Sequence, residues 1–165
     1  MSSSDRRTVL TLIAALPVAA CGFVPAYGPN GPAKGLMGRV RVDDPGDKRS
    51  FDLVARLEER LGRPEAAAYR LAYTVTTTNT ALGITQTNAI TRYNVTGHVD
   101  YTLRSAADDS VLISGTVQNF TSYSASGTVV STAASERDAY VCLMRLLADE
   151  IVTDMIAKSS ALANP

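Results

Sequence analysis

The chain has 165 residues, and its 16 Lys and Arg balance its 16 Asp and Glu. Removing the two arginines and the one aspartate of residues 1–20 changes the net charge only to −1, so charge gives no reason to expect a nucleic-acid partner. The remaining length suits one domain with one core. Two cysteines and one histidine form no metal-binding spacing.

Residues 1–20 have the layout of a bacterial export signal. Arg6 and Arg7 precede the apolar run Val9–Leu16, which is too short for a permanent transmembrane helix. An Ala-Ala pair directly before Cys21 resembles a lipobox, in which the cysteine is acylated and becomes the first residue of the mature protein. We therefore expect a lipoprotein signal peptide over 1–20 and lipidation of Cys21; an ordinary secretory signal is the alternative.

The residues after the cysteine predict the membrane to which the protein is sorted and a tether between lipid and domain. In the lipoproteins that this signal resembles, an aspartate after the cysteine favours the inner membrane, whereas Gly22 and Phe23 stand here, so we expect the outer membrane. The paired arginines leave the export route open between the general and twin-arginine pathways. Pro and Gly are dense from Val24 to Lys34, which disfavours helix and strand, so 21–35 is expected to be a lipidated N-terminus and tether.

Residues 36–158 are expected to form a single domain, followed by a frayed tail at 159–165. The first element is a short strand in which apolar and charged residues alternate, so one face is predicted to be buried. The apolar members are Leu36, Val40 and Val42.

A helix is predicted next. Asp47 or Ser50 can cap its start, and Gly62 before Arg63-Pro64 is a stop signal. Apolar residues recur at three- and four-residue spacing, as in a surface helix with one buried face. This stripe comprises Phe51, Leu53, Val54, Leu57 and Leu61.

Alternating residues from Ala68 to about Ser124 predict antiparallel strands with one buried and one polar face. The run Asn79–Ile90 fits either a long loop or an extension of the hairpin, and the pattern does not separate the two. The buried phase holds Tyr69, Leu71, Tyr73 and Val75, then Tyr93, Val95, Val99, Tyr101 and Leu103, then Val111, Ile113 and Val117.

A second amphipathic helix is predicted after a loop at 124–134. Ser135 and Asp138 resemble a capping box, and the helix is expected to run to about Lys158. Two such helices can cover the apolar face of the sheet. The predicted fold is therefore α+β (broadly α/β): a two-layer sandwich of a mainly antiparallel four-stranded sheet with two helices on one face, in the order β-α-β-β-β-α.

Reactive groups are few. His98 and Asp100 point to the same side of a strand, and a nearby hydroxyl would complete a triad. There is no nucleophile-elbow motif, so no enzyme, catalytic residue, cofactor or metal is expected. Cys142 lies in an apolar helical stretch and has no disulfide partner if Cys21 is acylated, so a buried, inert thiol is predicted.

The polar face of the sheet offers the better binding candidates. Arg70, Arg92 and Arg104 lie among many Thr, Asn and Gln. Arginines on a rigid sheet can hold phosphates through forked hydrogen bonds, and a hydroxyl-rich face suits sugars. The alternative is that these are water-facing charges which discourage aggregation at sheet edges. Arg92, beside Tyr93, is the first candidate.

Several different short segments follow one another in a characteristic order along the mature chain. They are Cys21-Gly22-Phe23 with the Pro-rich tether, Tyr69-Arg70-Leu71, Thr91-Arg92-Tyr93, Tyr101-Thr102-Leu103, Tyr123, Arg137-Asp138-Ala139 and Leu147-Ala148-Asp149-Glu150-Ile151. In this order and spacing the chain resembles the LptE family of lipopolysaccharide-assembly lipoproteins.

The resemblance implies a non-enzymatic lipoprotein, anchored by lipid on the periplasmic side of the outer membrane. Such a protein plugs the LptD β-barrel, assists its assembly and helps insert lipopolysaccharide into the outer leaflet. Its expected partners are an LptD-type barrel, lipopolysaccharide and the membrane. The resemblance further implies lipopolysaccharide binding through basic residues, here Arg92 and Arg70. The alternative is a stand-alone periplasmic lipoprotein that binds a small ligand or peptidoglycan.

Overall fold

The computed structural model describes residues 25–28, 31–84 and 89–159. The predicted signal peptide 1–20, the expected lipidation residue Cys21 and the tail from 160 lie outside the described residues. The elements are the 3₁₀ helix η1 (Pro32–Gly35), β1 (Val40–Val42), α2 (Lys48–Leu61), β2 (Tyr69–Ile84), β3 (Ile90–Ser105), β4 (Val111–Ser124) and α3 (Val129–Ser159).

The sheet has the strand order β1-β2-β3-β4. The pairs β2–β3 and β3–β4 are antiparallel, and β1 runs parallel to β2. This parallel pair follows from the chain path, because a helix between two strands carries the chain back to the end where the first strand began. The predicted α+β fold and its order β-α-β-β-β-α are confirmed, with a sheet that is mixed rather than wholly antiparallel.

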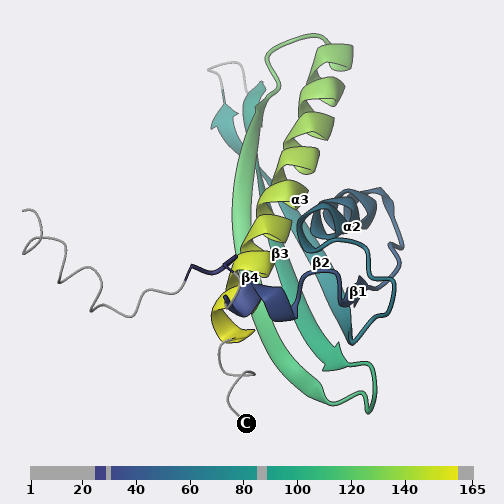
Figure 1. Cartoon of the computed structure of the whole chain (residues 1–165). Helices are drawn as coiled ribbons and strands as arrows, with labels where there is room; N and C mark the ends of the chain where they lie inside the picture. Colours follow the sequence, from purple (N-terminus) through teal and green to yellow (C-terminus); the bar gives the residue numbers. More distant parts are fainter. Residues whose placement is uncertain (1–24, 29–30, 85–88, 160–165) are drawn as a thin grey trace, which may run out of the picture.

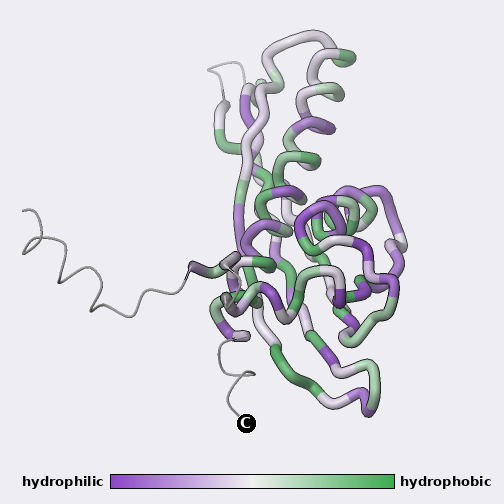
Figure 2. The backbone as a smooth tube through the Cα atoms, viewed as in Figure 1, coloured by the Kyte–Doolittle hydropathy of each residue, from purple (hydrophilic) through white to green (hydrophobic). Residues whose placement is uncertain are grey.

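Both helices cover the same face of the sheet, with α3 lying along it and α2 beside α3 (Figure 1). Hydrophobic and hydrophilic residues alternate along both helices (Figure 2), and their apolar sides meet the apolar phase of the strands in one core. The fully buried centre of this core includes Leu53, Leu57, Leu71, Val95, Val99, Leu103, Leu143, Leu147, Ile151 and Met155.

The β2–β3 hairpin extends through most of the run that the sequence left undecided. Pairing continues from Tyr69↔Ser105 to Ile84↔Ile90, with register shifts around Gly83. For the part of Asn79–Ile90 that is described, the hairpin interpretation is therefore the right one. The alternation weakens there because the strands project beyond α2, so both of their faces tolerate polar residues.

The inner part of the predicted tether packs on the domain. Pro32–Gly35 form η1, in which Ala33 is fully buried, and the Ser159 hydroxyl donates to the Pro32 carbonyl at 3.2 Å. Proline is compatible with the first turn of a helix, where its missing N–H would be unpaired anyway. Leu36 is also buried, but it follows η1 and is not part of β1.

Helix α2 begins and ends at the predicted signals. The Asp47 carboxylate accepts a hydrogen bond from the Ser50 N–H at 2.7 Å, and the Asp47 N–H donates to the Ser50 hydroxyl, which completes a capping box. Gly62 closes the helix with a φ of 78°. The prediction for Phe51 is wrong: it is 59% exposed, because it lies roughly 100° around the helix from the centre of the buried stripe.

Helix α3 begins at Val129, so the predicted loop at 124–134 is too long and Ser135 is not the cap. The Ser131 N–H donates to the Thr128 hydroxyl at 3.2 Å, an N-capping contact. The Ser135 hydroxyl donates to the Ser131 carbonyl inside the helix. Apolar periodicity did not predict this start, because the first turns of α3 bury no apolar stripe. Val129, for example, is 87% exposed.

Cys142 is exposed, which contradicts the predicted buried thiol. Its neighbours Leu143 and Met144 are both fully buried. At about 100° per residue, Cys142 lies on the opposite side of α3 from the centre of the buried face. Leu143 and Met144 therefore point into the core, whereas Cys142 points to solvent.

Two arginines of α2 clamp one carboxylate of α3. Arg56 donates to both oxygens of Asp149 at 3.0 Å, and Arg60 donates at 2.8 Å. Partial burial alone would raise the pKa of Asp149, but the hydrogen bonds and charges of the two arginines outweigh it and lower the pKa below its usual range. The ionised carboxylate therefore stabilises the packing of α2 against α3.

Gly97 lets α3 approach β3 closely. A Cβ at this position would come within 2.7 Å of Leu147 Cδ1 and 3.1 Å of Leu143 Cδ2. Any side chain here would therefore force Leu143 and Leu147, both fully buried, to shift within the core.

We expect Gly97→Ala to lower the free energy of unfolding by about 1–3 kcal/mol, because it overpacks the core. Urea denaturation followed by circular dichroism measures the change. Gly46→Ala is the control, because a Cβ at Gly46 meets nothing within 4 Å. Equal effects of both variants would show that α3 does not depend on close contact at Gly97.

We expect Asp149→Asn to lower the free energy of unfolding by about 1–2 kcal/mol at pH 7, because two partly buried arginines lose their anionic partner. Since the folded-state pKa is lowered, this contribution is complete above about pH 4 and is lost as the pH falls through the folded pKa. The gap between wild type and variant should therefore close in acid.

Denaturant unfolding of both proteins across pH 2–7 tests this dependence. Glu58→Gln, which removes the partner of the highly exposed Arg63, should change stability by less than about 0.5 kcal/mol. A difference between wild type and Asp149→Asn that does not vary with pH would contradict the assignment.

Candidate functional site

The sheet face turned away from the helices, here called the open face, is polar. Side chains alternate along a strand, and the strand register places one polar set on this face. Its members are Arg70, Thr74, Thr76, Thr78 and Thr80 of β2; Arg92, Asn94, Thr96, His98, Asp100, Thr102 and Arg104 of β3; and Ser114, Thr116, Gln118, Phe120, Ser122 and Ser124 of β4.

Two of the predicted arginines lie together at one end of this face. Arg70 pairs with Arg104 in the register of β2 and β3. Arg70 donates to both oxygens of Asp43, at 2.6 and 3.0 Å, and this hydrogen-bonded pair raises the pKa of the guanidinium. Arg104 approaches Asp109 at 3.3 Å. Both cations are thus neutralised by neighbouring carboxylates.

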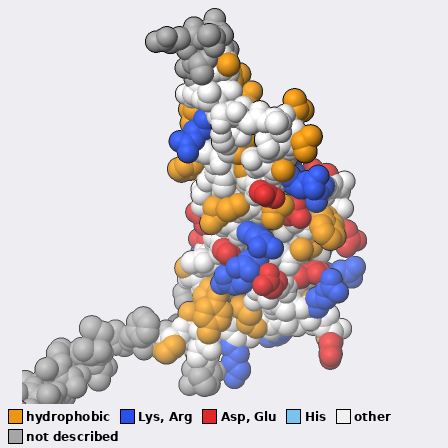
Figure 3. Space-filling view, turned by 90° about the horizontal axis from the view of Figure 1, so that it is seen from above, with side chains coloured by type: hydrophobic (Ala, Val, Ile, Leu, Met, Phe, Trp, Pro, Cys, Tyr) orange, Lys and Arg blue, Asp and Glu red, His pale blue; other side chains and the backbone are white. Residues whose placement is uncertain are grey.

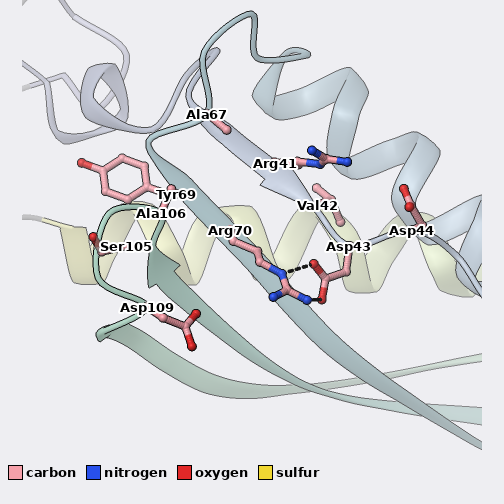
Figure 4. A pocket seen from close by; sticks show the side chains of 10 residues that line it. All are labelled: Arg41, Val42, Asp43, Asp44, Ala67, Tyr69, Arg70, Ser105, Ala106 and Asp109. Carbon is pink, nitrogen blue, oxygen red and sulfur yellow. Dashed lines mark hydrogen bonds and ion pairs between the residues drawn. The ribbon is translucent and has the colours of Figure 1, made fainter.

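A hollow of about 710 Å³ opens beside Arg70. Figure 4 shows the Arg70 guanidinium turned toward Asp43, with Asp109 on the strand-connecting turn across from it. The charged lining residues are Arg41, Arg70, Asp43, Asp44 and Asp109. Because carboxylates outnumber arginines in this lining, the hollow gives no net attraction to an anionic ligand.

Arg92 lies at the opposite end of the open face. It is exposed, it pairs in register with Gly83 and Ser124, and within the described part of the chain it has no ion pair or side-chain hydrogen bond. A Cβ at Gly83 would come within 2.5 Å of Thr91 Oγ1, the neighbour of Arg92 on β3. Arg92 therefore presents an uncompensated guanidinium, the group that binds phosphate or carboxylate through two hydrogen bonds.

The strand beneath Arg92 is held from the covered side of the sheet. The rings of Tyr93 and Tyr123 stack with centroids 5.2 Å apart, and Asn79 donates to the Tyr123 hydroxyl at 2.9 Å. Such contacts fix the backbone that carries the guanidinium. The structure does not bring Arg92 and Arg70 together, because twelve residues of β3 separate Arg92 from Arg104, about 40 Å of strand.

The geometry around His98 is not that of a catalytic triad. His98 Nε2 lies 3.5 Å from Asp100 Oδ1, and the Thr116 hydroxyl donates to that same oxygen at 2.6 Å. In a triad the hydroxyl bonds to the imidazole and the carboxylate holds the other ring nitrogen. Here the hydroxyl and the imidazole converge on the carboxylate instead.

One side of the molecule carries charges of both signs. On the side seen in Figure 3, Lys and Arg are interspersed with Asp and Glu. Among the residues that the structure describes, no group of three or more His, Cys, Asp and Glu is placed to hold a metal ion. Within the same residues, no helix combines the length and the apolar character that crossing a membrane requires.

Sequence reasoning missed Phe120 on the open face. This ring is 64% exposed, although its neighbours in the same phase of β4 are Gln118 and Ser122. An aromatic residue in the polar phase of an alternating strand is the signal that marks it.

Comparison with known proteins gives one family. The model described as "LptE: Lipopolysaccharide-assembly" matches residues 37–155. A comparison with curated protein sequences finds no match.

Solved structures share the fold at low sequence identity. A protein of Caulobacter crescentus CB15 described as a lipoprotein is 19% identical, with a TM-score of 0.67 over 81% of this chain and 98% of that chain. The rare lipoprotein B of Shewanella oneidensis is 14% identical, with a TM-score of 0.59 over 76% and 98%. A minor lipoprotein of Acinetobacter baumannii is 15% identical, with a TM-score of 0.54 over 72% and 89%.

Proposed function

The chain belongs to the LptE family of lipopolysaccharide-assembly proteins, and on that premise we propose that it is the lipid-anchored subunit of an LptD-type outer-membrane β-barrel. In this role it plugs the barrel, assists its assembly and helps to insert lipopolysaccharide into the outer leaflet. The family match over residues 37–155 is the observation that carries the proposal.

The polarity of the domain surface supports a place inside a barrel. The open face is lined with hydroxyl and amide side chains, and the lumen of an outer-membrane barrel is polar and wet. On the side seen in Figure 3, charges of both signs are interspersed and form no large region of one sign. Such a surface can sit against a polar wall without a large electrostatic cost.

Lipidation of Cys21 would keep the domain at the membrane. Two or more acyl chains anchor a protein stably where a single chain does not. A short connection is supported because η1 already packs against the end of α3, and Pro32 is only eleven positions after Cys21 in the sequence. The sorting signal at Gly22 and Phe23 supports the periplasmic side of the outer membrane as the location.

Arg92 is the better of the two candidate residues for binding the phosphate groups of lipopolysaccharide. Its guanidinium is exposed and uncompensated within the described residues, whereas Arg70 is already held by both oxygens of Asp43. A phosphate at Arg70 would have to displace that carboxylate. We therefore assign Arg92 the primary contact and Arg70 at most a secondary one.

We expect this protein to co-purify with a β-barrel partner when it is extracted from outer membranes in mild detergent. Affinity capture on a C-terminal tag, followed by gel filtration and mass spectrometry, tests the complex. A Cys21→Ala variant should lose the membrane anchor and reduce recovery of the complex. Recovery of the lipidated protein as a monomer would instead favour a stand-alone lipoprotein that binds a small ligand or peptidoglycan.

We expect Arg92→Ala to weaken lipopolysaccharide binding about tenfold, as befits the loss of one charge-assisted contact of about 1.4 kcal/mol. Because the side chain is exposed, thermal stability should not change. Arg145→Ala, which removes an exposed arginine from α3, is the matched control. Binding that falls equally in both variants would indicate a general charge effect and remove Arg92 as a specific site.

A further inference from the structure

Phe120 is an exposed aromatic ring within a polar surface. It lies on the open face opposite Thr96, which in turn pairs with Thr78. Along its own strand the residues on the same face are Gln118 and Ser122. The ring is 64% exposed, so most of it is accessible from solvent among polar side chains.

The backbone that carries this ring is fixed. β4 is an edge strand, and the Phe120 N–H donates to the Asn119 side-chain oxygen at 2.9 Å. The Asn119 amide nitrogen in turn donates to Glu150 of α3 at 3.4 Å. The position of Phe120 is thus tied both to the sheet and to the helix behind it.

Hydrogen-bonding groups flank the ring on both sides along β3. On one side the Ser122 hydroxyl donates to Asn94 at 3.3 Å, and Asn94 donates to Thr96 at 3.4 Å. On the other side His98 lies 3.5 Å from Asp100. These amide, hydroxyl and imidazole groups include both donors and acceptors.

We propose that Phe120 is the stacking platform of a saccharide-binding site on the open face. A pyranose ring presents C–H groups on its faces and hydroxyl groups around its edge. The C–H face complements the negative face of the aromatic ring, and the edge hydroxyls match the mixed donors and acceptors of Asn94, Thr96 and His98.

The charge distribution indicates which saccharide fits. Phe120 is level with Thr96, four residues along β3 from Arg92, which is about 13 Å of strand. Polar uncharged side chains occupy the surface between them on β3 and β4. The face therefore complements an oligosaccharide that has neutral rings over Phe120 and an anionic group at Arg92. This inference deepens the proposed function and rests on it, since it assigns the sugar portion of lipopolysaccharide to this face.

A protein partner would leave a different signature. Apolar side chains scattered singly are common on protein surfaces, and Phe51 of α2, 59% exposed, is one of them. A protein interface built on Phe120 would gain from further apolar side chains on the open face, whereas the residues next to Phe120 there are Thr96, Gln118 and Ser122.

Titration calorimetry with fully deacylated lipopolysaccharide, which keeps the sugars and phosphates but lacks the acyl chains, tests the site. Phe120→Ala should weaken binding about five- to tenfold, consistent with the loss of an aromatic contact. Phe120→Tyr keeps the ring and should retain binding. Phe51→Ala, the matched loss of an equally exposed ring, should have no effect. Circular dichroism melting curves of all variants should coincide.

The outcomes separate this inference from the proposed function. If Arg92→Ala weakens binding of intact lipopolysaccharide while Phe120→Ala leaves oligosaccharide binding unchanged, the saccharide site is wrong and the proposed function stands. If wild type binds the oligosaccharide through Phe120 but the protein captures no barrel, the site stands and the proposed role fails. If Phe120→Ala reduces barrel capture but not oligosaccharide binding, the ring is a protein contact and the inference is overturned.

Discussion

The close contact of α3 with β3 and β4 is the constraint on which the rest of the structure depends. Gly97 has no side chain where Leu143 and Leu147 cross the strand, so the helix lies directly on the sheet. At the far end of α3, the Tyr101 hydroxyl donates to Asp154 at 2.5 Å, and Lys158 donates to the same carboxylate and to the Ser114 carbonyl. Helix and sheet are therefore joined along their whole contact by packing and by polar bonds.

This arrangement leaves one face of the sheet for function. With α2 and α3 on the covered face, most of the apolar phase of the strands is buried in the core, although Val111, predicted in that phase, is 53% exposed opposite Arg104. The polar phase remains exposed on the other face. The long antiparallel strands hold the side chains of the open face at regular intervals, because the hydrogen-bonded sheet fixes the backbone that carries them. The Lys158 contact with Ser114 also covers a backbone carbonyl of the edge strand β4, which limits pairing with other chains.

Alternation and capping chemistry predicted most of the fold, because these signals are local. The α2 boundaries followed from Asp47 and Gly62. The order of elements followed from the alternation of apolar residues in strands and their three- and four-residue spacing in helices. The start of α3 escaped prediction because its first turns project beyond the core, where no apolar stripe is needed. Cys142 was misplaced because sequence neighbours on a helix point in different directions. The parallel β1–β2 pair depends on chain path, which periodicity does not report.

The candidate site was predictable in composition but not in arrangement. Sequence alone places Arg70, Arg92 and Arg104 in one polar phase, yet their value as ligand contacts depends on neighbours from other elements. Asp43 and Asp109 reach Arg70 and Arg104 only through the strand register and the β3–β4 turn, so two of three similar arginines are neutralised. An ion pair of this kind must be broken before a phosphate can bind, whereas Arg92 requires only the release of water. The two ends of the open face therefore differ: Arg70 and Arg104 at one end are paired with carboxylates, whereas Arg92, on the side nearer Phe120, is available to an anion.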